Sequence, residues 1–324
     1  MHRLRDIQSS TLVVALIVLL LIVGAVTTPG FTVPGNFGVI LQFSAPTLIV
    51  ALGLATVVLG KGIDLSVGAM VVVAPQVVLQ LVAFGVDEPV ALLIVLAGSV
   101  VFGLVNGWLV AVVGVPALIA TLGTAQLLLG GVKVWVLESN YYPVSADSFL
   151  GELAFRNILG IPSSVVVAIV LALLTIGLWQ FTAFGRVLRG VGDNFATARN
   201  GGAPVRGIQV STYMVSALLA CVAGFFIASR EGSVTTTATA FSPMIFVALT
   251  AVVIGGVSLS GGRGNVLGVV AGTLFIGIIA NLLTLNSFSQ AAQNFVQAAA
   301  LLSAVLLDAL LHPREEETAK SGDL

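Results

Sequence analysis

Long apolar runs, separated by short polar segments, occupy most of this 324-residue chain. A helix needs about 20 apolar residues to cross the hydrocarbon core of a bilayer. Within that core a single segment satisfies its own backbone polar groups only as a helix. Ten spans meet this criterion, near residues 11–27, 38–59, 67–86, 89–113, 116–136, 163–182, 212–229, 244–260, 265–284 and 288–311. The pattern predicts an all-α, polytopic integral membrane protein of about ten transmembrane helices.

Composition supports a lipid environment and excludes several functions. The chain is 58% hydrophobic and only 8% charged, whereas soluble domains carry about a quarter charged residues. A formal net charge of −1 argues against a nucleic-acid partner, because no basic face is available. The single cysteine is Cys221, and the two histidines, His2 and His312, lie near the chain ends. We therefore expect no disulfide within the chain, no metal site and no histidine-based catalysis.

The basic residues indicate the direction of the spans, because cytoplasmic loops are enriched in lysine and arginine. With a cytoplasmic N-terminus and alternating spans, ten basic residues face the cytoplasm: Arg3, Arg5, Lys61, Arg186, Arg189, Arg199, Arg206, Arg263, Arg314 and Lys320. Three face the other side: Lys133, Arg156 and Arg230. An even number of spans also places the C-terminal tail inside. The first run is expected to be an uncleaved span, since residues 28–30 offer no small-x-small cleavage site.

The longer internal loop contains the signals of a short helix. Asp193 or Asn194 is suited to N-cap a helix over 195–199, and glycines 201 and 202 are suited to end it. Pro204 is then suited to open the following span. Two interpretations stay open for this loop: a helix that docks into a partner, or a basic segment that only fixes topology.

Three motifs resemble those of the permease subunits of ribose-type monosaccharide ABC importers. The internal loop is similar to their coupling loop, which reads F-G-R, then G-x-N-P, then A-A-R and a glycine. The matching residues are Phe184, Gly185, Arg186, Gly192, Asn194, Ala198, Arg199 and Gly201. Phe195 stands where proline is usual, and Thr197 interrupts the small-residue pattern. Segment 62–68 reads G-I-D-L-S-V-G, after Lys61 in place of a common glycine, and segment 253–262 reads V-I-G-G-V-S-L-S-G-G.

The resemblance implies an importer of the bacterial inner membrane. Its parts are a cytoplasmic ABC ATPase, an extracytoplasmic sugar-binding protein and two permeases, the second being another copy or a paralogue. Residues 1–312 are expected to form one permease domain in lipid, with a coupling loop at 184–211, an external loop at 137–162 and a cytoplasmic tail at 313–324. The chain has no phosphate-binding loop, since Gly60-Lys61 is followed by Gly62, so ATP is expected on the partner subunit. We expect no enzymatic activity and no cofactor in the permease itself.

The resemblance also suggests where the ATPase acts. The implied coupling residues are Arg186, Arg189, Asp193, Asn194, Arg199 and Gly201. The implied cytoplasmic turns near the ATPase contain Gly62, Asp64, Ser66, Gly68, Gly255, Gly256, Gly261 and Gly262. The residues alone favour a structural alternative, in which Asp64 and Ser66 cap the third span and the glycines allow tight turns and close packing.

A neutral sugar needs amides and hydroxyls along its path rather than charges. The polar side chains proposed for that path are Gln76, Asn106, Gln126, Gln290, Gln293, Asn294 and Gln297. The last four share one face of the tenth span by their spacing. The alternative is that these amides bond helices to one another. Ribose-like pentoses, hexoses and polyols all fit such a path.

An autonomous secondary carrier or channel for a small neutral solute is the alternative function. No acidic residue lies in the middle of a predicted span, whereas ion-coupled carriers normally keep an ionisable group there. This absence favours the ABC permease.

Overall fold

The computed structural model describes the backbone of residues 2–235 and 244–311, and the side chains of residues 13–235 and 244–306. Each of the ten predicted ranges contains a helix. These helices are α1 (His2–Thr27), α2 (Pro34–Leu59), α3 (Val67–Ala83), α4 (Glu88–Trp108), α5 (Ala117–Trp135), α7 (Ser163–Phe181), α10 (Val205–Glu231), α11 (Met244–Ile254), α12 (Val266–Leu285) and α13 (Gln290–Leu311). A π-helical turn, η1 (Leu109–Val113), continues α4.

Six helical segments of the described chain are long and apolar enough to cross a membrane. They are Pro34–Leu59, Glu88–Val113, Ala117–Trp135, Ser163–Phe181, Val205–Glu231 and Val266–Leu285. Val13–Thr27, α3 and α11 are shorter apolar helices. The expectation of an all-α polytopic membrane protein is therefore confirmed, while the count of ten crossings stays a prediction.

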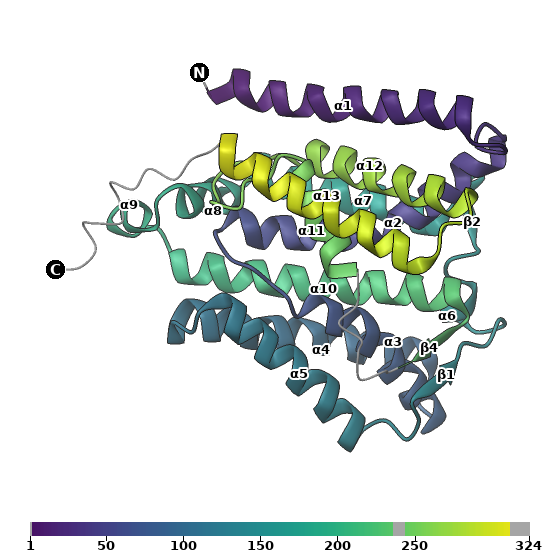
Figure 1. Ribbon diagram of the computed structural model, residues 1–324. Coiled ribbons are helices and arrows are strands. Elements are labelled where there is room, and N and C mark those ends of the chain that lie inside the picture. The colour runs from purple at the N-terminus through teal and green to yellow at the C-terminus, as the bar shows by residue number, and fades with distance from the viewer. Residues whose placement is uncertain (1, 236–243, 312–324) are drawn as a thin grey trace.

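Helix α10 lies at the centre of the bundle and packs against α2, α3 and α4 (Figure 1). Glycines permit this close packing. A Cβ on Gly103 of α4 would lie 2.5 Å from the carbonyl oxygen of Tyr213, and one on Gly107 would lie 2.6 Å from Cα of Val210. Gly224 of α10 approaches α3 in the same way, 2.4 Å from the Val71 oxygen. Close approach of small residues is the usual basis of helix packing in lipid.

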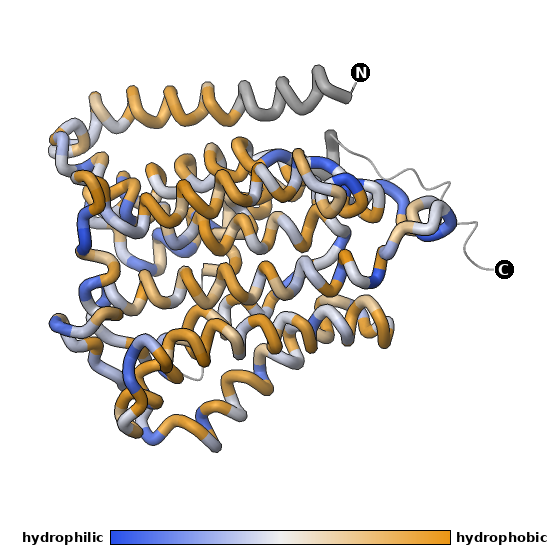
Figure 2. Tube along the Cα trace, turned by 180° about the vertical axis from the view of Figure 1, so that it is seen from behind, coloured by the Kyte–Doolittle hydropathy of each residue, from blue (hydrophilic) through white to orange (hydrophobic). Residues whose placement is uncertain are grey.

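Helix α1 lies along one edge of the bundle, where its main contact is α12 (Figure 1). A small apolar cluster around Phe31, Ile40 and Ile278 joins these parts. Hydrophobic residues extend over the whole length of the helices and hydrophilic residues gather toward the two ends of the bundle (Figure 2). The outward apolar surface is what a lipid-facing protein requires.

One end of the bundle carries short strands. β1 (Tyr141–Pro143) pairs antiparallel with β4 (Ser233–Thr235), and β2 (Asn157–Ile158) pairs with β3 (Ile161–Pro162). Helix α6 (Phe149–Glu152) lies between them in sequence. The predicted external loop 137–162 therefore contains three short strands and a short helix, and we call this segment the cover.

The opposite end differs from the prediction of one short helix in a loop. Two helices occur there, α8 (Ala183–Asp193) and α9 (Phe195–Asn200), and α10 begins at Val205 rather than near 212. Helix α8 is amphipathic, burying Leu188 and Val191 while Arg186 is exposed. A search for apolar spans overlooks such a helix because it is short and half polar.

Two other predictions concern span ends and chain ends. The eighth span was expected to reach residue 260, but α11 ends at Ile254, since Gly255 and Gly256 begin a turn. The predicted tail 313–324 lies outside the described residues, as do residues 236–243 between α10 and α11. The side chains of Arg3, Arg5, Arg314 and Lys320, used to assign topology, lie outside them as well.

Candidate functional site

Helix α9 has the ends that the sequence predicts. The Asn194 side chain accepts a hydrogen bond from the Thr197 backbone N–H at 2.9 Å, which identifies Asn194 rather than Asp193 as the N-cap. Gly201 follows the helix, and Gly202 has a φ of +77°, a left-handed conformation that favours glycine. Pro204 precedes α10. No α9 residue is buried, so the helix presents its surface to solvent or to a partner.

Helix α8 fixes α9 to the bundle through Gly192. A Cβ at this position would lie 2.0 Å from the Leu59 carbonyl oxygen and 2.2 Å from the Gly262 nitrogen. These two groups bond to each other, since Gly262 N–H donates to the Leu59 oxygen at 2.9 Å. Arg189 adds a hydrogen bond from Nη1 to the Gly264 carbonyl at 3.1 Å. Three segments, α8, the end of α2 and the turn after α11, therefore meet at one point, which we call the coupling junction.

The turn at 255–264 needs its glycines for backbone reasons. Gly256, Gly261 and Gly262 have φ values of +79°, +84° and +75°, where other residues are strained. Gly255 allows α11 to approach α12, since a Cβ there would lie 2.5 Å from the Gly268 oxygen. Each of these glycines thus has a structural reason to be glycine.

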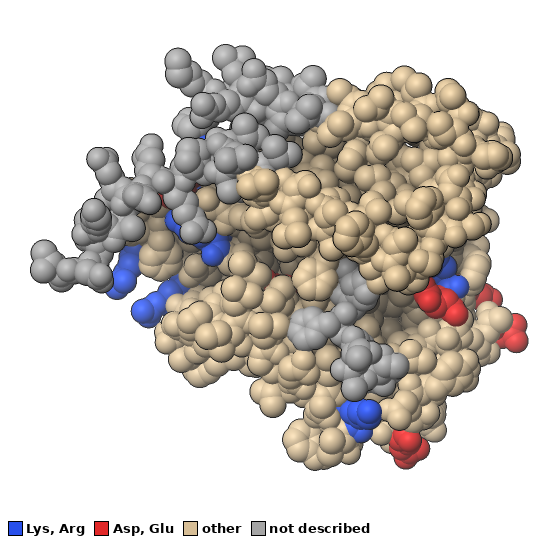
Figure 3. Space-filling view, viewed as in Figure 1, with Lys and Arg blue, Asp and Glu red and all other residues tan. Residues whose placement is uncertain are grey.

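The predicted coupling residues divide into two groups. Arg186, Asp193 and Arg199 are exposed. Arg189 bonds inward to the junction, and Asn194 caps α9. Lysine and arginine side chains gather at this end, whereas the other end carries both basic and acidic residues, as Figure 3 shows for one face. A contact with an ATPase remains a prediction for all of them.

The coil between α2 and α3 runs inward from the coupling junction (Figure 1). Asp64 of this coil is completely buried, and its Oδ1 accepts hydrogen bonds from the Ser66 N–H at 3.0 Å and the Ser66 hydroxyl at 2.5 Å. Asp64 thus bonds to the residue that precedes α3, while the Ser66 side chain makes no capping bond to the helix. Burial raises the pKa of the Asp64 carboxyl, and hydrogen bonding from Ser66 and from the nearby Ser216 hydroxyl opposes the rise only in part.

The glycines of this motif differ in their surroundings. Gly62 packs against Tyr213, whose hydroxyl would lie 2.7 Å from an added Cβ. Gly68 is buried in the first turn of α3. Lys61 has a φ of +68°, which explains physically why a glycine is common there in the related motif.

Asn106 belongs to a buried polar chain rather than to an open path. Its Nδ2 donates to the Ser66 hydroxyl at 2.8 Å, and its Oδ1 accepts from the Thr124 hydroxyl at 2.6 Å. Thr121 of α5 accepts from the Leu65 N–H at 3.2 Å. These bonds join the coil to α4 and α5, which agrees with the alternative that this amide holds helices together.

Two of the tenth-span amides face a cavity. The cavity measures about 250 Å³ and lies among α2, α10, α11, α12 and α13. Its polar lining consists of neutral groups and one cation: Ser44, Thr47, Thr273, Asn281, Thr284, Gln293, Gln297 and Arg230. The Arg230 guanidinium stacks 4.2 Å from the Phe43 ring centroid and pairs with Glu231 at 2.9 Å.

The other predicted path residues do not line this cavity. Gln290 and Asn294 are exposed and bond to each other at 3.0 Å. Gln126 is exposed on α5. Gln76 is completely buried, and within the described residues neither of its amide atoms has a hydrogen-bond partner.

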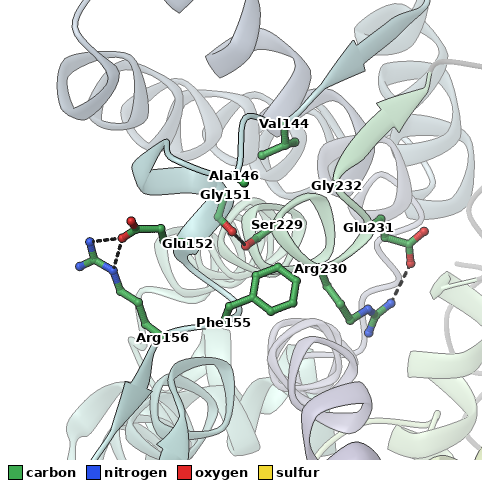
Figure 4. Close-up of a pocket in the computed structure, with 10 residues that line it drawn as sticks. All are labelled: Val144, Ala146, Gly151, Glu152, Phe155, Arg156, Ser229, Arg230, Glu231 and Gly232. Atoms are coloured by element: carbon green, nitrogen blue, oxygen red, sulfur yellow. Dashed lines mark hydrogen bonds and ion pairs between the residues drawn. The ribbon is translucent and has the colours of Figure 1, made fainter.

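A second cavity, of about 430 Å³, opens among the short strands, α6 and the end of α10 (Figure 4). Arg156 pairs with Glu152 at 2.6 Å on one side, and the Arg230–Glu231 pair lies on the other, with Phe155 between them. Ser229 donates to the Gly151 carbonyl at 2.8 Å and joins α10 to the cover. The predicted external loop 137–162 and the end of α10 therefore line a hollow with both charge signs.

Sequence reasoning did not single out Ser216 or Tyr213 of α10, both of which lie against the coil. Tyr213 directs its hydroxyl toward the Ile63 carbonyl at 3.5 Å. Ser216 is buried, and a Cβ on Gly53 would lie 3.0 Å from its Cα. A serine and a tyrosine in an apolar run carry little signal by themselves, because their role depends on which helix face meets the coil.

Comparison with known proteins gives consistent results. The sequence profile of a family described as "Branched-chain amino acid transport system / permease component" matches residues 36–305. The ribose import permease of Escherichia coli K12 is 35% identical, over 91% of this chain and 92% of its own length. The ribose import permease of Bacillus subtilis is 33% identical over 90% and 89%, and the fructose import permease of Rhizobium meliloti is 30% identical over 86% and 78%. No solved structure matches significantly.

Proposed function

Because this chain belongs to the branched-chain amino acid transport system / permease component family, as a permease of the ribose-type ABC importers, we propose that it forms the pathway by which a monosaccharide enters the cytoplasm. It is a multi-pass protein of the bacterial inner membrane. A partner ATPase binds and hydrolyses ATP, an extracytoplasmic sugar-binding protein delivers the substrate, and a second permease, a copy or a paralogue, completes the pore. In this proposal the chain crosses the membrane ten times, with both termini in the cytoplasm.

The coupling junction is the observation that carries this proposal. Helix α9 is exposed and packs against α8, and α8 in turn meets the end of α2 and the turn before α12 through Gly192. A push on α9 by an ATPase therefore reaches two membrane helices through backbone contacts, without long flexible side chains. Packed backbones resist compression, so small displacements are transmitted as rigid-body shifts.

The sugar class rests on the cavity among α2 and α10–α13. Amides of Gln293, Gln297 and Asn281, with nearby threonine hydroxyls, offer donors and acceptors without net charge. The positive charge of Arg230 is engaged by Glu231 and by the Phe43 ring. Such a lining suits a neutral polyhydroxylated solute, and relatives are named as ribose and fructose permeases. In alternating access this cavity opens first outward and then inward.

The hollow of the strand-bearing end is the proposed docking surface for the binding protein. It combines two ion pairs with the exposed Phe155, and Arg156 also stacks on the exposed Phe149. Mixed charge around an apolar centre is typical of transient protein interfaces.

The test is reconstitution of the permease with its ATPase and binding protein in liposomes, with radiolabelled D-ribose and D-fructose as probes. The double variant Arg199→Glu/Gly201→Ala is expected to lose uptake while ATP hydrolysis and the melting temperature persist. Alanine fits at Gly201, where the nearest atoms lie 3.4 Å from an added Cβ. Arg206→Glu is the matched control, since Arg206 is exposed at the start of α10 but outside α9.

Unchanged uptake by the double variant refutes the coupling role of α9. Uptake by the permease alone, without ATPase or ATP, refutes the ABC mechanism and supports an autonomous carrier or channel.

A further inference from the structure

Asp64 is a completely buried carboxyl without a cationic partner among the described side chains. The two ion pairs among the described side chains involve other residues. Lys61, the nearest cation in sequence, is exposed. The titratable group that faces Asp64 from α10 is Tyr213. Helices α4 and α5 contribute Asn106, Thr121 and Thr124 to this region, which are all neutral. A carboxylate buried here would be uncompensated, which is strongly unfavourable.

One oxygen of the Asp64 carboxyl has no hydrogen bond among the described residues. Oδ1 accepts two bonds from Ser66, whereas Oδ2 has no partner. The Ser216 hydroxyl lies against this carboxyl, and its oxygen is also buried without a hydrogen bond of good geometry. One hydrogen bond between Oδ2 and Ser216 satisfies both atoms, with either the serine hydroxyl or a protonated carboxyl as the donor. Because no cation among the described side chains offsets a buried carboxylate here, burial favours the protonated carboxyl as the donor.

We propose that Asp64 is a positioning residue held as a neutral carboxylic acid, which donates its proton to Ser216 and so links the 60–66 coil to α10. Asn106 and Thr121 link the same coil to α4 and α5. The coil begins at Leu59, whose carbonyl accepts from Gly262 in the coupling junction. The bound proton therefore completes a connection from the junction to three helices of the bundle. This role in transport rests on the proposed function, while the protonation state does not.

The first test measures protonation on the full-length permease alone in detergent. The unfolded carboxyl titrates near 3.8, and the folded group has a raised pKa, so folding favours the protonated form. The stabilising contribution of the proton is complete at low pH and is lost as pH rises from about 4 toward the folded pKa. The melting temperature of the wild type is thus expected to fall with pH relative to Asp64→Asn, which cannot ionise. Asp87→Asn, at an exposed carboxyl beside α4, is the control and is expected to follow the wild type.

The second test measures uptake and ATP hydrolysis in the complete reconstituted complex. Asp64→Asn keeps an N–H donor for Ser216, and its uptake is expected to remain within about twofold of the wild-type rate. Asp64→Ala is expected to reduce uptake about tenfold, the usual size of a lost coupled contact. Adding Ser216→Ala to Asp64→Ala is expected to cost nothing further, since the two residues act through one bond.

Two results would overturn the assignment. One is a wild type that gains stability over Asp64→Asn as pH rises, since this is the behaviour of an ionised carboxylate. The other is Asp64→Asn as inactive as Asp64→Ala while both variants remain folded. If the wild-type complex takes up neither probe, the proposed function is at fault, and the pH series on the isolated permease still decides the protonation state.

Discussion

Replacing Gly192 with alanine tests whether the coupling junction transmits motion from α9 to the membrane helices. The added methyl carbon would lie 2.0 Å from the Leu59 oxygen and 2.2 Å from the Gly262 nitrogen. Both atoms belong to backbones, so neither can rotate away, and α8 must move by more than an ångström. The hydrogen bond between Gly262 and Leu59 would be distorted in the process.

The magnitude follows from three terms. Overpacking in a tight site costs about 1–3 kcal/mol, and a weakened hydrogen bond adds about 0.5–1.5 kcal/mol. The higher helix propensity of alanine offsets about 0.5–1 kcal/mol of this cost relative to glycine. The net destabilisation expected for Gly192→Ala is therefore about 0.5–4 kcal/mol, concentrated at the α8 contact.

Gly190→Ala is the matched control on the same helix, since an added Cβ there meets no atom within 4 Å. Melting temperature, uptake and ATP hydrolysis are measured for both variants in the reconstituted complex. We expect Gly192→Ala to melt earlier and to transport fewer sugar molecules per ATP, and Gly190→Ala to match or exceed the wild type. Equal transport per ATP in the two variants would refute the reasoning, because the junction would then carry no motion.

Two further predictions concern the polar residues around this region. Asn106→Leu is expected to destabilise the permease by about 1–3 kcal/mol, since the buried Ser66 hydroxyl loses the donor that it accepts from and the buried Thr124 hydroxyl loses its 2.6 Å acceptor. The exposed Gln126→Leu should leave the melting temperature unchanged, and equal effects of the two variants would contradict the buried chain. Asn194→Ala is expected to cost helix α9 about 1 kcal/mol. Faster hydrogen exchange over 195–200, with the other helices unaffected, would confirm it, whereas unchanged exchange would show that Asn194 is not the cap.

Local signals in the sequence were sufficient for helix positions and ends. The apolar runs locate ten helices of the described chain, because lipid demands length and apolarity from any segment that crosses it. Asn194 and Gly202 mark α9 because caps depend on the chemistry of neighbouring residues. Helix α8 was missed because its pattern is amphipathic and the chain was scanned for uniformly apolar segments.

The sequence does not show which face of each helix packs against other helices. Side chains toward lipid and toward neighbouring helices are both apolar here, so hydrophobic periodicity does not separate them. Asn106 and Gln126 look alike in sequence, yet the first is buried in a polar chain and the second is exposed. The same holds for the tenth-span amides, of which Gln293 and Gln297 line the cavity while Gln290 does not.

The sequence by itself thus determined a helical membrane permease, the positions of its apolar helices and the ends of helix α9. Only the tertiary structure decided that Gly192 meets Leu59, that Asp64 lies against Ser216, and which amides border a cavity. The physical reason is that helix formation and capping depend on residues a few positions apart. Close backbone approach and buried hydrogen bonds instead depend on how distant segments pack together.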